Sequence, residues 1–380
     1  MNKEGWVIKK LGNICEILDS KRKPVTKKDR KSGIYPYYGA TGIQDYVAEY
    51  IFDGTFVLVG EDGAKWGANE NSAFLVKGKC WVNNHAHVLQ IKDYVIDKWV
   101  IYYLNNKNLG EYITGAVIPK LNQASLRSIP IPVPPLSTQE QIVNELDTLN
   151  DIIAKKKEQL AELDTLAQAT FYDMFGDPLE NEKGWDIKRL EDFLEYIGDI
   201  GSNGSNEVVA KNLKMLDNED YAIMIRTVNL SKNDFKNNLK YVSEETYNFF
   251  KKSKIFGGEI IMNKIGSAGD FWLMPNLNKP VSLGLNQLVI RTKNINILFL
   301  YNLLSTDYGK TLIKSKIRGA TTKSITKSAV KELPIFNPPL LLQNQFAERI
   351  EAIEKQKELI NKSIKEVQQL FDYTMDKYFN

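Results

Sequence analysis

A long stretch of apolar residues at heptad spacing constrains the fold of this chain more than any other feature. From Ile142 to Ala167, apolar side chains recur at alternating steps of four and three residues, with one polar interruption at Lys156. This spacing is typical of an α-helix that lies along another helix. We expect one helix over residues 137–175, and at roughly 1.5 Å per residue it would be about 58 Å long. A small core does not need such a helix, so the segment is predicted to act as a spacer.

The helix is predicted to begin directly after a proline-rich segment. Residues Ile129–Leu136 have the sequence Ile-Pro-Ile-Pro-Val-Pro-Pro-Leu, and these prolines exclude an earlier helical start. Ser137 or Thr138 can cap the first turn. At the other end, Gly176 and Pro178 are expected to stop the helix.

The same pattern occurs a second time in the chain. At an offset of 204 residues, the proline-rich segment recurs as Leu333–Leu340 and the apolar seam as Phe346–Phe371, again with a single lysine, Lys357. Trp6 and its neighbours recur around Trp185, at an offset of 179 residues. The offsets differ by 25 residues, so the second half contains an insertion between its tryptophan and its prolines. A tandem repeat of this size predicts two related globular units, each followed by a long helix.

The predicted fold class is α+β, with two β-rich mixed domains separated by two long helices that form an antiparallel coiled coil in a pseudo-two-fold tandem repeat. The expected parts are residues 1–136 for the first domain, 137–178 for the central helix, 179–338 for the second domain and 339–380 for the distal helix. Pairing the two seams about their midpoints places Lys156 opposite Lys357. There the two lysines would extend outward or meet a carboxylate of a partner.

Short apolar runs bounded by turn residues predict strands within each globular unit. The predicted strands are Phe56–Gly60, Cys80–Val82, His87–Ile91, Tyr221–Arg226 and Leu288–Arg291, and Ile260–Gly266 is predicted to be a strand followed by a turn. Two short amphipathic segments, Asp97–Asn105 and Ile297–Ser305, are expected to form helices.

Composition excludes several other classes of protein. The chain has 380 residues, enough for two or three domains with full cores. The apolar run Ile295–Leu304 is too short to span a bilayer, and the first residues lack the apolar core of a signal peptide. Two cysteines, Cys15 and Cys80, form no disulfide framework, and with only two histidines, His85 and His87, no zinc site is expected. We therefore expect a cytoplasmic protein.

Charge clustering points to a nucleic-acid ligand more than net charge does. The net charge of +3 is too small to indicate such a ligand, but basic residues gather at 21–31, 251–254 and 314–318. For the group at 21–31, a solvated surface loop is the alternative. Two β-rich units at a set spacing suit bipartite recognition, in which each unit reads a few base edges while Lys and Arg bind phosphates. Because the units differ in length, they are expected to read different sequences.

Motifs that carry catalysis in other proteins are incomplete in this chain. Asn337–Leu340 is similar to the Asn-Pro-Pro-aromatic motif of amino-methyltransferases, but its last residue offers no ring to stack on a flipped base. Glu61–Lys65 could supply a nuclease-like cluster of carboxylates and lysine, yet its counterpart Asn263–Gly266 has no carboxylate. We find no nucleotide-binding glycine turn and no catalytic serine or histidine motif. An enzyme is therefore the least favoured class, and the prolines are expected to end a strand and direct the chain into the helix.

The layout of the whole chain resembles the specificity subunits of type I restriction–modification systems. The resemblance lies in Trp6–Leu11, Tyr37–Gly42, Asn83–Val88, Ile129–Gln141 and Phe171–Pro178, and in their second-half copies. It implies two target-recognition domains that read the halves of a split, asymmetric site in double-stranded DNA. It also implies two repeated helical regions that set the spacer and bind two methyltransferase subunits.

The same resemblance implies that this chain has no catalytic site and no cofactor of its own. S-adenosylmethionine, ATP and Mg²⁺ would bind to partner subunits, among them a restriction translocase–nuclease that joins through the methyltransferase. The rival class is a coiled-coil adaptor whose end domains bind protein or carbohydrate. It accounts for the long helices but not for the paired basic clusters.

Candidates for contacts with DNA come from the basic, aromatic and polar segments of both units. In the first unit they are Lys21, Arg22, Tyr38, Thr41, Lys65, Asn84, His85 and Lys120. In the second unit they are Arg226, Asn229, Lys264, Ser267, Asn286, Lys323 and Ser324. Asn and His side chains can bond base edges. For the segment Asn83–His87, a turn into a strand with a hydrogen-bonded histidine is an equal alternative.

Overall fold

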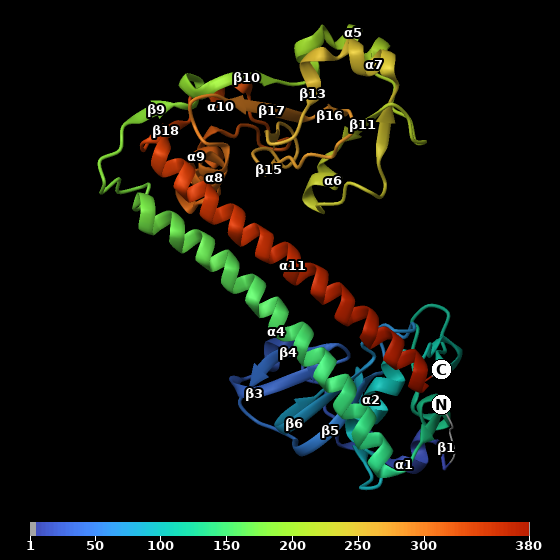
Figure 1. The fold of residues 1–380 in the computed structure, drawn as a ribbon. Helices are drawn as coiled ribbons and strands as arrows, with labels where there is room; N and C mark the ends of the chain where they lie inside the picture. The colour runs from blue at the N-terminus through green and yellow to red at the C-terminus, as the bar shows by residue number, and fades with distance from the viewer. Residues whose placement is uncertain (1–4, 380) are drawn as a thin grey trace. The chain divides into compact units, whose positions relative to one another are not determined.

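The computed structural model describes residues 5–379, which divide into two compact units (Figure 1). Unit 1 comprises Met1–Glu158 with Asn361–Asn380, and unit 2 comprises Gln159–Ile360. Residues 1–4 and 380 of the predicted domains lie outside the described residues. Each unit therefore contains one globular part and one half of each long helix.

A six-stranded sheet forms the centre of unit 1 (Figure 1). In spatial order its strands are β2 (Cys15–Ile17), β7 (Ala86–Ile91), β5 (Phe52–Gly60), β6 (Ala73–Val82), β3 (Ser32–Gly39) and β4 (Gly42–Val47). Neighbouring strands run antiparallel except β3 and β6, which are parallel. Val57 and Val59 of β5 pack with Trp99 of helix α2 (Asp97–Asn106), while Leu58 faces a second apolar cluster. The strands and the helix predicted for this unit are confirmed, and β5 and β6 are longer than expected.

Unit 2 divides the corresponding strands between two four-stranded sheets. One contains β10 (Leu194–Gly198), β17 (Gln287–Thr292), β14 (Ile260–Asn263) and β15 (Phe271–Leu273) in that order. The other contains β12 (Lys240–Val242), β11 (Ala222–Ile225), β16 (Val281–Leu283) and β13 (Lys254–Ile255). The pair β11 and β16 is parallel, as β3 and β6 are in unit 1. The strands predicted for this unit are confirmed.

The predicted insertion lies mainly between β10 and β14. Val57 lies opposite Leu89 in unit 1, and Ile260 lies opposite Ile290 in the same position of unit 2. Most of the extra residues of the second half therefore precede β14. They form three short helices around the second sheet of unit 2, α5 (Asn206–Asn212), α6 (Thr227–Ser231) and α7 (Glu244–Phe249) (Figure 1).

In both units the first strand pairs with the proline-rich segment that precedes the long helix. β1 (Val7–Lys10) is antiparallel to β8 (Pro130–Val133), and β9 (Ile187–Arg189) is antiparallel to β18 (Pro334–Phe336). The prolines thus end a strand before the helix, as predicted. The remaining α-helices are α1 (Leu11–Ile14), α3 (Gln123–Ser128), α8 (Ile297–Ser305), α9 (Asp307–Lys316) and α10 (Lys327–Lys331).

The long helices α4 (Leu136–Phe175) and α11 (Leu340–Phe379) begin immediately after their prolines. The N–H groups of Thr138 and Gln139 donate to the carbonyl of Pro135, at 2.9 and 3.1 Å. Leu342 and Gln343 donate to Pro339 in the same way. The prediction that Ser137 or Thr138 caps the helix is therefore wrong, because α4 begins at Leu136 and both residues lie within its first turn. No helix among the described residues combines the length and the apolar character needed to cross a membrane.

A buried glutamine fastens each long helix to its globular part. Gln139 accepts from the N–H of Ile96 and donates to the carbonyl of Pro134, both at 2.9 Å. Gln343 makes the same two bonds, with Asn296 and Pro338, both at 2.8 Å. Both glutamines are 0% exposed. The glutamine that recurs after each proline-rich segment therefore has a structural role in both copies.

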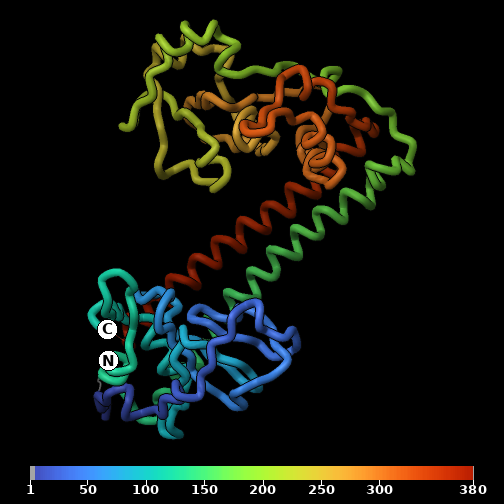
Figure 2. The backbone as a smooth tube through the Cα atoms, turned by 180° about the vertical axis from the view of Figure 1, so that it is seen from behind, coloured from blue at the N-terminus to red at the C-terminus, as the bar shows by residue number. Residues whose placement is uncertain are grey.

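Within each unit the two half-helices pack side by side in antiparallel directions (Figures 1 and 2). In unit 1, Tyr378 of α11 donates to Glu145 of α4 at 2.9 Å, beside buried Leu146. In unit 2, Phe171 of α4 and Phe346 of α11 pack edge to face, with ring centroids 5.6 Å apart.

The register predicted from the seam midpoints is wrong. It placed Lys357 opposite Lys156, but Lys357 Nζ lies 2.6 Å from Asp164 Oδ1 and 2.6 Å from Glu354 Oε1. Phe171 and Phe346 also pack against each other in the core of unit 2. Partial burial lowers the pKa of Lys357, but the hydrogen bonds to the two carboxylates outweigh burial and raise the pKa.

Replacing Gln343 by alanine should test the role of the buried glutamine. The change leaves the N–H of Asn296 and the carbonyl of Pro338 without their partner, so the free energy of unfolding should fall by about 1–3 kcal/mol. Urea denaturation measures this change. Gln345→Ala alters an exposed position on the same helix and should change the free energy of unfolding by less than about 0.5 kcal/mol. Equal effects of the two substitutions would contradict the assignment.

Candidate nucleic-acid interface

Four chain segments of unit 1 meet where β2 and β5 end and β7 begins. They are residues 19–22, 61–65, 83–86 and 120–123, and we call them the unit 1 loop cluster. Two backbone hydrogen bonds join three of them: Glu61 N–H donates to the carbonyl of His85, and Leu121 N–H donates to the carbonyl of Glu61, both at 2.8 Å. Residues far apart in the sequence are thereby held next to one another.

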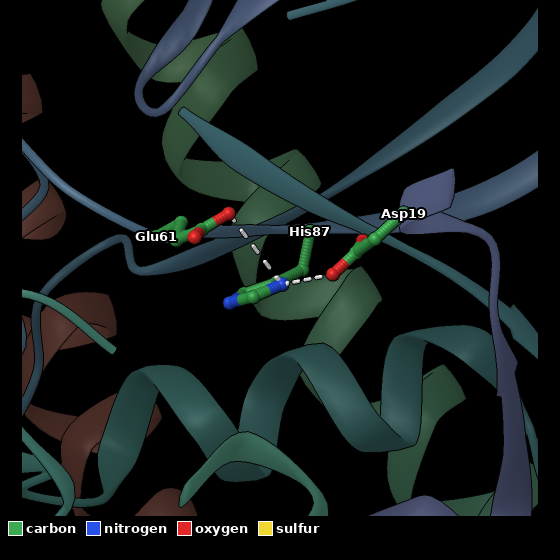
Figure 3. A group of neighbouring side chains, drawn as sticks. All are labelled: Asp19, Glu61 and His87. Carbon is green, nitrogen blue, oxygen red and sulfur yellow. Dashed lines mark hydrogen bonds and ion pairs between the residues drawn. The ribbon is translucent and has the colours of Figure 1, made fainter. Parts of the chain in front are cut away.

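Buried charges hold the unit 1 loop cluster together (Figure 3). Asp19 Oδ2 lies 2.6 Å from His87 Nδ1 and accepts from Gln123 Nε2 at 3.0 Å. Glu61 pairs with Arg22 at 2.5 Å and with Lys120 at 2.8 Å. Arg22 also donates to the carbonyl of Ala86 at 2.8 Å. Every segment of the cluster is therefore tied to another by a charged side chain.

Both ring nitrogens of the fully buried His87 face oxygen acceptors. Nδ1 faces the Asp19 carboxylate, and Nε2 lies 2.7 Å from the carbonyl of Leu121. Both ring nitrogens are therefore engaged within the protein. Burial raises the pKa of the Asp19 carboxyl, but the hydrogen bond and charge of His87, together with Gln123 and Arg22, outweigh burial and lower the pKa.

Asp19, Glu61 and His87 are close enough to hold a metal ion, with candidate ligand atoms within 4.8 Å of one another. The positive side chains of Arg22 and Lys120, however, already neutralise Glu61. Both nitrogens of the histidine are also used within the protein. This donor set fits an internal ion-pair network and not a metal centre.

The same four segments meet in unit 2. They are residues 199–202, 263–267, 284–287 and 323–327, and we call them the unit 2 loop cluster. Lys264 N–H donates to the carbonyl of Asn286 at 2.6 Å, and Ile325 N–H donates to the carbonyl of Lys264 at 2.9 Å. These bonds are the counterparts of those at Glu61. They make Lys264 equivalent to Glu61, and Asn286 equivalent to His85.

Asp199 is the buried centre of the unit 2 loop cluster. Its carboxylate lies 2.6 Å from Lys264 Nζ and 3.1 Å from Lys327 Nζ, and it accepts from Ser202 Oγ at 2.8 Å. Burial raises the pKa of the Asp199 carboxyl, but the hydrogen bonds from Lys264, Ser202 and Lys327 outweigh burial and lower the pKa to about 2. The aspartate is therefore ionised at neutral pH.

Most of the candidate DNA-contacting residues lie in the two loop clusters. Those whose side chains are exposed there are Lys21, Lys65, Asn84, His85, Ser267, Asn286 and Lys323. His85 is 48% exposed and also pairs with Asp62. Contact of these residues with DNA stays a prediction, and their exposure leaves them accessible to a ligand.

Other candidates are engaged within the protein. Arg22 is only 12% exposed, Lys120 and Lys264 form the ion pairs described above, and Ser324 forms backbone bridges to Arg318 and Ile265. Asn229 is 2% exposed and accepts from the N–H of Arg226 at 3.3 Å, and the Arg226 side chain donates to the carbonyl of Asn238. The structure thus gives Arg22 and Asn229 partners within the protein.

Two candidates lie outside the loop clusters on the sheet of unit 1. Tyr38 packs against Phe74, with ring centroids 6.0 Å apart, beside the apolar cluster around Leu58. Thr41 is exposed in the turn between β3 and β4. The carbonyl of Tyr38 accepts from the N–H of Asn83, so this strand adjoins the unit 1 loop cluster.

Sequence reasoning missed the two buried aspartates. Asp19 ends the sequence Glu-Ile-Leu-Asp, and Asp199 ends the sequence Glu-Tyr-Ile-Gly-Asp. The second sequence is one residue longer than the first, and its extra residue belongs to an irregularity in β10 between Leu194 and Tyr196. It increases the repeat offset by one, so a comparison at the constant offset of 179 does not align the aspartates. A search that allowed a bulge would have matched them.

A cavity of about 830 Å³ lies away from the loop cluster of unit 2. Its walls include Phe171 of α4, Trp272 of β15 and Tyr301 of α8. None of the candidate residues is among the described residues that line it. The cavity therefore adds nothing to the candidate interface.

Duplicated α+β units, each leading into a long helix, define the class of protein. The model of the type I restriction–modification DNA specificity domain matches the chain twice, over residues 3–165 and 182–369. The chain therefore belongs to the type I restriction–modification DNA specificity family. The predicted α+β tandem repeat and the resemblance noted from the sequence are confirmed.

Similar proteins are found in several organisms. A candidate type I restriction enzyme specificity subunit of Haemophilus influenzae is 42% identical over 147 residues, which are 39% of this chain and 38% of that protein. The MjaVIII specificity subunit of Methanocaldococcus jannaschii is 22% identical over 400 residues, covering 97% of this chain and 92% of that one. The crystal structure of an S subunit from M. genitalium shares the fold, with a TM-score of 0.63 and 14% identity, and the match covers 100% of this chain and 97% of that one.

The low pKa of Asp199 predicts a pH-dependent contribution to stability. A carboxyl whose folded pKa lies near 2, below its ordinary 3.8, stabilises the fold fully above pH 3.8 and loses this effect as the pH falls through 2. Asp199→Asn should lower the free energy of unfolding at pH 7 by about 2 kcal/mol. In denaturant titrations, the difference from the parent chain should shrink between pH 4 and pH 2.

The exposed Asp173 provides the control for this prediction. Asp173→Asn removes a carboxylate from the surface of α4 in the same unit and should change the free energy of unfolding little at any pH. A cost of Asp199→Asn that stays constant over the acidic range would contradict the ionised, bonded state of Asp199.

Proposed function

We propose that this chain is the non-catalytic, DNA-reading subunit of a type I restriction–modification complex. Unit 1 reads one half of a split site and unit 2 reads the other. Membership of both halves of the chain in the specificity family supports this assignment. Two methyltransferase subunits bind the repeated helical regions, which set the spacer between the half-sites, and restriction subunits join through the methyltransferase.

The proposal places all catalysis on the partner subunits. S-adenosylmethionine, ATP and Mg²⁺ are bound there, and this chain supplies sequence specificity. The complex works in the cytoplasm, where DNA is the substrate. Two free, buried cysteines, Cys15 and Cys80, fit such a reducing compartment.

The observation that carries the proposal is the pair of loop clusters with equivalent backbones and different side chains. His85 is equivalent to Asn286, and Lys120 is equivalent to Ser324. These pairs differ in charge and in their pattern of donors and acceptors. Base edges are distinguished by such patterns, so the two units should read different sequences. The recognised site is therefore asymmetric although the protein is duplicated.

Different exposed residues of the clusters serve different parts of the DNA. Asn84 and His85 in unit 1 and Asn286 in unit 2 can donate to and accept from base edges. Lys21, Lys65 and Lys323 carry charges suited to phosphates. Phosphate contacts supply affinity for any sequence, and base contacts supply the discrimination.

Genome-wide adenine methylation tests the proposed function. The chain is expressed with its cognate methyltransferase, and the methylated sites are compared with those of cells that express the methyltransferase alone. One split, asymmetric motif that disappears without this chain is expected. Exchanging residues 1–136 for the same part of another specificity protein should change only one half of the motif. No motif, or an unsplit palindrome, would overturn the proposal and favour the adaptor.

Single substitutions should separate base contacts from phosphate contacts. Asn286→Ala should relax one base position in one half-site at a cost of about 1–3 kcal/mol. Lys323→Ala, in the same loop cluster, should weaken binding to all sequences alike and reduce the slope of log K against log salt by about 1. Binding isotherms of the complex with the correct and altered duplexes measure both effects. Loss of discrimination in Lys323→Ala, with none in Asn286→Ala, would reverse the assignment.

A further inference from the structure

Asp19 and Asp199 occupy equivalent positions in the two units. Ile17 of β2 lies opposite Leu89, and Ile197 of β10 lies opposite Ile290. Each aspartate comes two residues later, at the start of the first segment of its loop cluster. Their side chains are 7% and 6% exposed, so neither is accessible to a large ligand.

The two aspartates use partners at the same positions, although the partners differ in chemistry. At the first residue of the following short helix, Gln123 donates to Asp19 at 3.0 Å and Lys327 donates to Asp199 at 3.1 Å. Three residues after each aspartate, Arg22 lies 3.4 Å from Asp19 and Ser202 donates to Asp199 at 2.8 Å.

The residue that follows the central strand completes each network with opposite charge. In unit 2, Lys264 reaches Asp199 directly at 2.6 Å. In unit 1 the equivalent residue is Glu61, and the positive Arg22 bridges it to Asp19. The carboxylate and its links to the same segments are therefore common to both units, while the groups that neutralise it are rearranged.

These links bear directly on the exposed residues of the clusters. Lys264 lies three residues before Ser267, and the backbone N–H of Lys264 is bonded to the carbonyl of Asn286. In unit 1, Arg22 donates to the carbonyls of Ala86 and Asn84, which flank His85. An anchored carboxylate fixes the relative positions of such side chains before a ligand binds. Less conformational entropy is then lost when DNA binds, and a wrong base meets side chains that cannot move to accommodate it.

We propose that Asp19 and Asp199 are positioning residues, each of which holds the base-reading loops of its own unit in register and so sets the sequence discrimination of one half-site without touching DNA. The proposal rests on the proposed function, because it assumes that each unit reads one half of the site.

The test uses the complex of the full chain with its cognate methyltransferase. Methylation rates are measured on the correct duplex and on duplexes with one base pair changed in either half. The ratio of the correct rate to the altered rate is the discrimination. Asp199→Asn should lower discrimination by about tenfold or more at the half read by unit 2 and leave the other half unchanged. Asp19→Asn should do the converse.

Substitutions at Lys327 distinguish positioning from general stability. Lys327→Gln gives unit 2 the glutamine that unit 1 has at the equivalent position, Gln123. This variant should keep the bond to Asp199 and retain discrimination. Lys327→Ala removes the bond and should lose discrimination at the same half-site as Asp199→Asn. If Asp199→Asn does not assemble into a complex, this pair of substitutions carries the test.

Three outcomes would overturn the proposal. The first is that Asp199→Asn and Lys327→Ala lower the melting temperature or all rates alike and leave discrimination intact, which would make the network merely structural. The second is that Asp199→Asn relaxes both half-sites equally. The third is that Lys327→Gln behaves like Lys327→Ala. If the parent complex itself methylates no split site, the proposed function fails, and the positioning role fails with it.

Discussion

Two backbone hydrogen bonds at a single residue determine the geometry on which the rest of each unit depends. The residue after the central strand donates from its N–H to the turn that leads into β7 in unit 1 and into β17 in unit 2. Its carbonyl accepts from the segment before the short helix. It is Glu61 in unit 1 and Lys264 in unit 2. Because the bonds use only backbone atoms, the side chain at this position can change even in sign of charge without altering how the segments meet.

This arrangement explains how one fold can present different recognition surfaces. The first strand with its proline-rich partner segment, and the buried glutamines Gln139 and Gln343, make the same contacts in both units. Differences include the loop clusters and the insertion between β10 and β14, which adds helices to unit 2, where the strands form two sheets. Buried carboxylates, Asp19 and Asp199, then join loops whose other side chains differ. The duplication supplies the framework, and the substitutions within it supply the asymmetry.

The framework could be predicted from the sequence because its signals are local and repeated. Heptad spacing, prolines before a helix and a recurring glutamine each act over a few residues and occur twice. The internal partners of the candidate residues could not be predicted in this way. Arg22 meets Glu61, which lies 39 positions away, and a one-residue bulge in β10 hides the equivalence of the aspartates. The helix register was missed because contacts between particular side chains, such as Lys357 with Asp164 and Phe171 with Phe346, cannot be read from the spacing of the seam.

Site-specific photocrosslinking tests most directly whether each unit reads one half of the site. A photoreactive amino acid is placed at exposed Asn84 or Asn286, and the crosslinked bases are mapped in the complex with methyltransferase and its DNA site. The account predicts that position 84 reacts with bases of one half-site only and position 286 with bases of the other half-site only. Reaction of both positions with the same half-site, or no reaction at either while an exposed position on a long helix crosslinks to bases, would contradict it.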